Sequence, residues 1–301
     1  MTSAKPLLGG IELGGTKCVC LIGTGPDDVR ARASIPTGND PAATLRQLEH
    51  ELRKGVSVHG PIAALGIASF GPLDLDRRSP AYGSITSTTK RGWRNVPIAT
   101  SFASIFNVPI GFDTDVNGAA LAEYRWGAAR DLADFAYVTV GTGVGVGLVV
   151  GGRTVCGFTH SELGHIRIAR IPGDRFAGAC TFHGDCVEGL ASGAAIAARM
   201  GVAAERISAQ DPVWDLVAHA LSQLLHTLVL ATAPRRILIG GGVAAGRPEL
   251  FPRMRSLLVE SLHDYLDLER LTGGMERYVV PPGLGSLAGP LGALALAADA
   301  I

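Results

Sequence analysis

Hydrophobic and polar positions along the first 115 residues predict the strands and helices of a mixed α/β domain. Short apolar runs bounded by glycine are typical of buried strands, whereas apolar residues that recur every three or four positions indicate a helix. We therefore expect strands at 7–13, 16–23, 29–35, 62–68 and 108–112, and helices at 41–55 and 96–106. The first helix should begin after the Asp40-Pro41 cap and end at Gly55.

A similar order of elements returns in the second half of the chain. We expect strands at 135–141, 144–150, 153–156, 236–239 and 276–280, and helices at 187–200, 212–232, 248–266 and 287–298. Two units that each open on a glycine-tipped hairpin indicate a duplicated α/β architecture, with two lobes around a cleft. We place the N-terminal lobe at 1–115, joined by the C-terminal helix within 287–301, and the second lobe at 116–286.

Composition narrows the class of protein. The chain has 301 residues, of which 47% are hydrophobic and 18% charged, so it can bury a large core. Its 27 basic residues balance 27 acidic ones, and we expect neither nucleic acid nor a membrane as a partner. Because the sequence shows no recognisable secretory leader and no run of about eighteen apolar residues, we expect a cytoplasmic protein.

Glycines gather at the tips of two predicted hairpins. The first glycine tip consists of Gly14, Gly15, Thr16 and Lys17, and the second consists of Gly141, Thr142 and Gly143. Backbone amides without side chains in the way can approach phosphate oxygens, and the threonines and the lysine add hydroxyls and a positive charge. A tight turn explains either tip alone, but the pair favours a site that holds a triphosphate from two sides.

A third glycine run, Gly240-Gly241-Gly242, follows the strand predicted at 236–239 and allows two interpretations. Through Ala245 it matches the Gly-x-Gly-x-x-Ala pattern of dinucleotide-binding proteins, which would indicate an NAD-dependent oxidoreductase. That pattern needs an acid at the end of the next strand, whereas the nearest acid, Glu260, falls inside a predicted helix. We therefore favour a strand-to-helix turn in which Gly241 and Gly242 lie against an adenosine.

Two acids follow the strand predicted at 108–112. Asp113 and Asp115 open a segment similar to an EF-hand loop, but its twelfth position is Tyr124 instead of a glutamate, which excludes calcium. These acids can cap a helix that starts near Gly118, and an acid just beyond a strand end can also act as a general base. Of the two, Asp115 is our choice for the base that accepts a hydroxyl proton during phosphoryl transfer.

The segment 160–188 carries four residues that commonly bind metals. We call them the Cys/His cluster: His165, Cys180, His183 and Cys186. Two thiolates and two imidazoles suit a closed tetrahedral zinc site, which is structural because it leaves no position for a reactive water. The alternative is a disulfide between Cys180 and Cys186, or buried thiols without a function. Glu162 and Glu188 bracket the Cys/His cluster and would place carboxylates on the wall of a site.

Six motifs, in this order along nearly the whole chain, resemble those of ROK-family sugar kinases. They are Glu-Leu-Gly-Gly-Thr-Lys at 12–17, Asp-Thr-Asp-Val-Asn-Gly-Ala-Ala at 113–120, Gly-Thr-Gly-Val-Gly at 141–145, Glu-Leu-Gly-His at 162–165, the cluster ending in Cys-Val-Glu at 186–188, and Gly-Gly-Gly-Val at 240–243. The resemblance implies an actin-like, ribonuclease H-like fold, ATP and Mg²⁺, and phosphorylation of a hexose hydroxyl. It makes Asp115 the catalytic base and implies a homodimer. The residues that it places against the sugar are Thr114, Glu162, His165 and Glu188.

Several details look like the bacterial fructokinase branch of that family. Most members have Asp where this chain has Glu12, and a Cys-x-Cys-x4-Cys cluster where this chain has Cys-x2-His-x2-Cys. Thr114, Gly92-Trp93 and the segment 82–88 also resemble fructokinases. We therefore expect conversion of D-fructose to fructose 6-phosphate. The alternatives are a glucose, mannose or N-acetylhexosamine kinase, a non-catalytic sugar sensor and the oxidoreductase, and the longer Glu12 leaves the Mg²⁺ ligands open.

Overall fold

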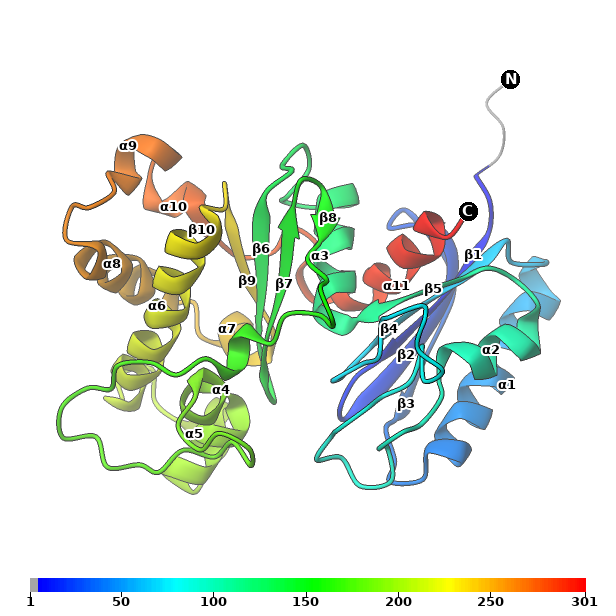
Figure 1. The fold of residues 1–301 in the computed structure, drawn as a ribbon, viewed down its shortest axis with the longest axis horizontal. Helices are drawn as coiled ribbons and strands as arrows, with labels where there is room; N and C mark the ends of the chain where they lie inside the picture. Colours follow the sequence, from blue (N-terminus) through cyan, green and yellow to red (C-terminus); the bar gives the residue numbers. More distant parts are fainter. Residues whose placement is uncertain (1–4) are drawn as a thin grey trace. The chain divides into compact units, whose positions relative to one another are not determined.

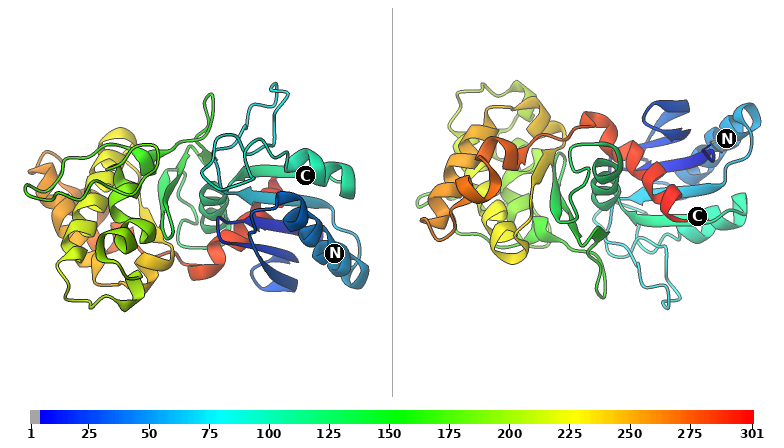
Figure 2. Two further views of the ribbon diagram at one scale, coloured as in Figure 1. Left: turned by 90° about the horizontal axis from the view of Figure 1, so that it is seen from below. Right: turned by 90° about the horizontal axis from the view of Figure 1, so that it is seen from above.

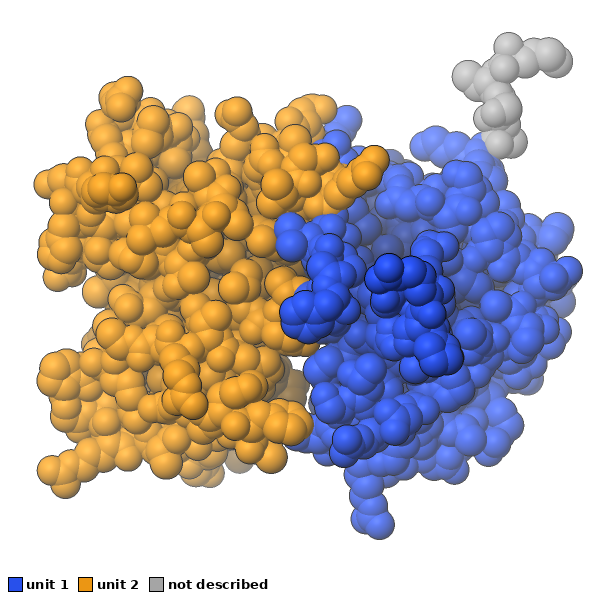
Figure 3. Space-filling model, viewed as in Figure 1, with its two compact units in different colours: residues 1–130, 154–160, 287–301 blue, residues 131–153, 161–286 orange. Residues whose placement is uncertain are grey.

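The computed structural model describes residues 5–301, which divide into two compact units (Figures 1 and 3). Unit 1 contains the chain up to Arg130 together with Thr154–His160 and Leu287–Ile301, and unit 2 contains Asp131–Arg153 and Ser161–Ser286. The expected boundary at residue 115 is therefore displaced, because the helix that follows it packs within unit 1.

Unit 1 is built on a five-stranded sheet with the order β3-β2-β1-β4-β5. Its strands are β1 (Leu8–Leu13), β2 (Lys17–Gly25), β3 (Asp28–Pro36), β4 (Ala64–Ser69) and β5 (Ile110–Thr114). The central strand β1 pairs antiparallel with β2 and parallel with β4, which in turn pairs parallel with β5. This register aligns Leu13, Ser69 and Thr114 at the carboxyl edge of the sheet, where open α/β sheets commonly bind ligands.

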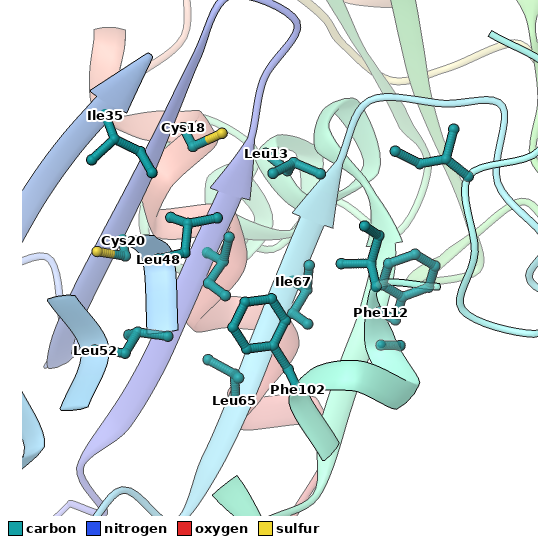
Figure 4. Close-up of a cluster of buried hydrophobic side chains, with 14 of the residues drawn as sticks. Leu13, Cys18, Cys20, Ile35, Leu48, Leu52, Leu65, Ile67, Phe102 and Phe112 are labelled. Atoms are coloured by element: carbon teal, nitrogen blue, oxygen red, sulfur yellow. The ribbon is translucent and has the colours of Figure 1, made fainter. Parts of the chain in front are cut away.

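Helices cover both faces of this sheet (Figure 2). The helices of unit 1 are α1 (Pro41–His59), α2 (Ala99–Phe106), α3 (Asp115–Trp126) and α11 (Ala288–Asp299). Leu48 and Leu52 of α1 and Phe102 of α2 join Leu65 and Ile67 of β4 in one core on the first face (Figure 4). Burial of these large apolar side chains provides the main driving force for folding of unit 1.

The other face of the sheet is lined with small residues, so α11 approaches it closely. A Cβ atom added to Gly66 of β4 would overlap the backbone of Ala293 in α11. One added to Gly292 would overlap the backbone of Gly118 in α3. Since a side chain at either position would push the helices apart, these glycines fix α3 and α11 in place over the sheet.

Unit 2 repeats the strand order of unit 1. Its sheet has the order β10-β9-β6-β7-β8, with β6 (Phe135–Val140), β7 (Val144–Val150), β8 (Arg153–Thr154), β9 (Ile237–Gly240) and β10 (Val279–Val280). The central strand β6 pairs antiparallel with β7 and parallel with β9, as β1 does with β2 and β4. The duplicated architecture predicted from the sequence is therefore confirmed.

Short helices and turns complete unit 2. The helices are α4 (Val187–Ala191), α5 (Gly193–Met200), α6 (Val213–Thr232), α7 (Gly242–Gly246), α8 (Leu250–Leu262), α9 (Leu268–Thr272) and α10 (Met275–Tyr278). Single 3₁₀ turns occupy η1 (Leu163–His165), η2 (Ala204–Arg206) and η3 (Gly285–Leu287). Among the described residues, only α6 is long and apolar enough to match a membrane span, and most of it is buried inside the structure.

Several predicted boundaries were wrong for identifiable reasons. Helix α1 continues past Gly55 because this residue is buried against Ile22 of β2, and Gly60 ends the helix instead. The helix predicted at 187–200 breaks at Ser192, whose hydroxyl accepts a hydrogen bond from the Ala195 amide and so caps α5. The strand predicted at 276–280 is reduced to two residues, because α10 takes up its first part.

Candidate active site

The carboxyl end of β5 runs directly into α3. Thr114 is the N-cap of this helix, and its hydroxyl accepts a hydrogen bond from the Asn117 amide at 3.1 Å. Asp115 is the first helical residue, so the helix begins three residues earlier than the start near Gly118 that the sequence suggested. The cap is therefore a threonine, and neither aspartate is used as one.

Asp113 is buried and fully engaged with its neighbours. One carboxylate oxygen accepts hydrogen bonds from the Thr114 amide at 2.7 Å and from the Asn117 side chain at 2.8 Å. The other accepts from the Thr154 hydroxyl at 3.1 Å, which ties the segment Thr154–His160 to unit 1. Burial raises the pKa of Asp113. These contacts give it a structural role.

Asp115 is only partly covered and differs from Asp113 in its contacts. Its Oδ1 accepts a hydrogen bond from the Val116 amide at 2.9 Å, in the first turn of α3. Burial nevertheless dominates and raises the pKa of Asp115 to about 6. A carboxylate of this kind is ionised at neutral pH and is a stronger base than an ordinary aspartate, as a general base for a hydroxyl requires.

Glu12, near the end of β1, lies within electrostatic reach of Asp115. Burial, and next the charge of Asp115, raise the pKa of Glu12 to about 7. Its carboxylate also contacts the start of α11, since a Cβ atom on Gly289 would overlap it. From the sequence Glu12 was visible only as a family variant, because nothing local reveals that β1 and α3 bring these two acids close together.

The first glycine tip is held by the strand end beside it. The Gly14 amide donates to the Lys17 carbonyl at 3.1 Å, which closes the turn. Thr37 donates through its hydroxyl to the Gly14 carbonyl at 2.7 Å and through its amide to the Thr16 carbonyl at 2.9 Å. Gly15 has no atom within 4 Å of the place where a Cβ would stand. The tip is thus fixed in shape and exposed.

The second glycine tip is held in the same way within unit 2. The Gly141 amide donates to the Gly143 carbonyl at 2.9 Å, and the Gly141 carbonyl accepts from the Gly193 amide at 2.7 Å. A Cβ atom on Gly241 would stand 2.5 Å from the Val140 carbonyl oxygen, and the Gly242 amide nitrogen lies 3.8 Å from the Cβ position of Gly141. The tip and the turn after β9, which the sequence linked to the phosphates and the adenosine, are therefore neighbours.

The Cys/His cluster is assembled by the turn η1 and the loop before α4. All four ligand atoms lie within 4.8 Å of one another, and the cysteines are free thiols, so the alternative disulfide is not formed. His165 Nδ1 is 3.6 Å from Cys180 Sγ and 3.5 Å from Cys186 Sγ, and His183 Nδ1 is 3.6 Å from Cys180 Sγ. With bonds of about 2.3 Å to sulfur and 2.0 Å to nitrogen, the ligand atoms of tetrahedral zinc lie about 3.5 Å apart. The donor set and its spacing fit zinc.

Two acids face the imidazole of this cluster. His165 Nε2 is 3.9 Å from Glu162 Oε2 and 3.9 Å from Glu188 Oε1. These distances are electrostatic contacts and are longer than hydrogen bonds; a carboxylate on this side of a metal-bound histidine is the group that commonly orients its ring. The structure thus brings together Glu162, His165 and Glu188 in unit 2, whereas Thr114 and Asp115 belong to unit 1.

Comparison with known proteins extends the resemblance to ROK-family proteins over nearly the whole chain. A model of the ROK family matches residues 8–300. A fructokinase of Pediococcus pentosaceus is 40% identical over 295 residues, covering 98% of this chain and 99% of that protein. A fructokinase of Zymomonas mobilis is 39% identical over 303 residues, covering 99% and 98%. A solved ROK hexokinase from Thermus thermophilus is 29% identical with a TM-score of 0.76, covering 97% and 98% of the two chains.

Proposed function

Because the chain belongs to the ROK family, we propose that it is an ATP-dependent sugar kinase that converts D-fructose to fructose 6-phosphate. The observation that carries the proposed chemistry is Asp115, a carboxylate whose pKa is raised to about 6 and which directly follows β5, at the carboxyl ends of the parallel strands β4 and β5. The fructose preference is supported by the fructokinases of Pediococcus pentosaceus and Zymomonas mobilis, each matched over nearly its full length.

Asp115 is the catalytic base of the proposed reaction. Its carboxylate accepts the proton of the C6 hydroxyl of fructose as that oxygen attacks the γ-phosphorus of ATP. The bond between this phosphorus and the bridging oxygen breaks, and ADP leaves with the electron pair. Phosphoryl transfer needs little covalent help from the protein, so accurate placement of the hydroxyl and stabilisation of charge supply most of the rate.

The glycine tips are proposed to bind ATP. The amides of Gly14, Gly15 and Gly143 and the side chains of Thr16, Lys17 and Thr142 contact the phosphates, and Gly241 and Gly242 lie against the adenosine. Glu12 is a proposed Mg²⁺ ligand, since it is a second acid within electrostatic reach of Asp115 and Mg²⁺ prefers oxygen donors. When bound, Mg²⁺ would neutralise phosphate charge.

The proposed sugar contacts are Thr114, Glu162, His165 and Glu188. Carboxylates and an imidazole offer the acceptors and donors that a polyhydroxylated substrate needs. The hydroxyl of Thr114 accepts from Asn117 as a helix cap, yet its own proton can still be donated to a sugar oxygen. Zinc in the Cys/His cluster would hold the His165 ring in place and take no part in the chemistry.

A coupled assay that measures ADP release from ATP over a panel of hexoses tests this function. We expect the highest kcat/KM with D-fructose. A higher value with glucose, mannose or an N-acetylhexosamine would keep the kinase activity and change the preferred sugar. Asp115→Asn should remove the activity. Absence of turnover with every hexose, or oxidation of a substrate with NAD, would refute the proposal in favour of a sugar sensor or an oxidoreductase.

The expected homodimer remains a prediction that light scattering during gel filtration checks.

A further inference from the structure

Glu188 lies between the Cys/His cluster and the second glycine tip, and it contacts both with different oxygens. Its Oε2 accepts a hydrogen bond from the Val144 amide at 3.1 Å, directly after the tip. Its Oε1 is 3.9 Å from His165 Nε2. One carboxylate therefore joins an imidazole of the cluster to the hairpin proposed to bind phosphate.

The packing of the hairpin shows that this contact is built into unit 2. A Cβ atom on Gly143 would stand 2.5 Å from Glu188 Oε2, so only glycine lets the carboxylate approach the tip at this position. A Cβ atom on Gly164, next to His165, would overlap the Val144 carbonyl. The turn η1 and the first turn of α4 thus both press against the start of β7.

The Cys/His cluster borders Glu188 both in space and in the sequence. His165 uses Nδ1 toward the two thiols and leaves Nε2 toward the carboxylate. Cys186 is the N-cap of α4, and its sulfur accepts from the Gly189 amide at 3.4 Å, one residue beyond Glu188. A metal ion that fixes Cys186 and His165 would therefore fix the acid between them.

We propose that Glu188 is a positioning residue that couples the Cys/His cluster to the second glycine tip, so that the cluster sets the affinity for the nucleotide. This inference rests on the proposed function, and it adds a role to an acid that was expected only to contact the sugar. The charge-assisted hydrogen bond that the Glu188 carboxylate accepts from the Val144 amide orients this amide and holds the tip in the conformation that receives phosphate.

Three variants of the full chain separate this role from a structural one. Glu188→Ala removes the acceptor of the Val144 amide. Glu188→Gln keeps an oxygen for that amide but turns a donor group toward His165 Nε2. Glu260→Gln is the matched control, because Glu260 is an exposed acid on α8 of the same unit.

Calorimetric titration with the ATP analogue AMP-PNP and Mg²⁺, without sugar, measures nucleotide affinity, and elemental analysis measures zinc. We expect Glu188→Ala to weaken AMP-PNP binding about tenfold, equivalent to about 1.4 kcal/mol. It should keep the zinc content of the wild type. Glu188→Gln should restore most of the affinity, and Glu260→Gln should bind as the wild type does.

Wild-type affinity in Glu188→Ala would overturn the inference while leaving the proposed kinase intact. Parallel losses of AMP-PNP affinity and zinc content in both Glu188 variants would also overturn the inference, because the acid would then act only by holding the metal. If Glu188→Ala does not fold, wild-type nucleotide affinity in Glu188→Gln still supports the hydrogen bond, and a tenfold loss with zinc retained opposes it. Failure of the wild type to bind AMP-PNP would instead refute the proposed function.

Discussion

At the scale of single residues, the distinguishing feature is the contrast between Asp113 and Asp115, two residues apart. The carboxylate of Asp113 accepts three hydrogen bonds, whereas that of Asp115 accepts a hydrogen bond from a backbone amide at the start of α3. The proposed base is therefore Asp115, and we expect Asp115→Asn to lower kcat at least about 10³-fold with little change in AMP-PNP affinity. Asp113→Asn should instead lower the Tm, measured by a thermal melting curve, because it disturbs three buried hydrogen bonds. Retention of kcat in Asp115→Asn would exclude it as the base.

The raised pKa of Asp115 also predicts how the activity of the wild type depends on pH. A base must be ionised to accept a proton, so kcat/KM should be level above about pH 7 and fall about tenfold per unit below the pKa near 6. A pH profile of kcat/KM for fructose measures this value. A decline centred near pH 4, the usual range of aspartate, would contradict the raised pKa.

The same burial should make the ionised side chain of Asp115 destabilise the folded state at neutral pH. Its pKa is about 6 in the folded chain against about 3.9 in the unfolded one, so the folded state binds the proton more tightly and the ionised form is disfavoured at neutral pH. Asp115→Asn should therefore raise the Tm at pH 7.5 by about 2 °C or more, and the gain should shrink as the pH falls from 6 to 4. Melting curves at several pH values test this; an equal gain at every pH would point to a cause other than ionisation.

At the scale of elements, the contact between α3 and α11 depends on two glycines that meet backbone to backbone. Gly292→Ala should destabilise unit 1 by about 2 kcal/mol, because the new methyl group overlaps Gly118 and the helices must separate. Gly246→Ala is the control: it lies in α7 with nothing within 4 Å of the added Cβ, so the change should be neutral or slightly stabilising. Urea unfolding of both variants measures the difference, and equal stabilities would refute close packing at Gly292.

Local patterns were sufficient to predict elements that owe their form to neighbouring residues. The hairpins around both glycine tips and the Cys/His cluster were found this way, because their residues lie close together in the sequence. Contacts between distant segments were not predictable. Gly55 resembles a helix end until Ile22 of β2 is seen against it, and Glu188 gives no sign of its hydrogen bond to Val144. The proximity of Glu12 and Asp115 likewise depends on how β1 and α3 are placed in unit 1.

At the scale of the whole molecule, duplication gives each unit a hairpin with a glycine tip beside its central strand, but only unit 2 carries the Cys/His cluster. The two sheets are built alike, so the difference lies in the inserted segment between β8 and α4. Two ion pairs also hold this segment. The Asp174 carboxylate lies 2.7 Å from a guanidinium nitrogen of Arg199 and 2.9 Å from one of Arg170. These cations hold the pKa of Asp174 well below its usual range. The segment therefore has two supports, one electrostatic and one that we attribute to zinc.

Removal of the metal should loosen this segment while the two sheets stay folded. We expect about one zinc per chain in the purified wild type and less than about 0.2 in Cys180→Ser. Trypsin should then cleave the variant first at the exposed Arg175, within the segment. Cys156→Ser is the matched control, since Cys156 is a free, exposed thiol outside the cluster and its loss should change neither zinc nor cleavage. Because the Asp174 ion pairs remain, the Tm of Cys180→Ser should fall by several degrees without loss of the folded state. A wild-type zinc content in Cys180→Ser would show that the thiol is no ligand, and full protection of Arg175 in the zinc-free variant would show that the ion pairs alone order the segment.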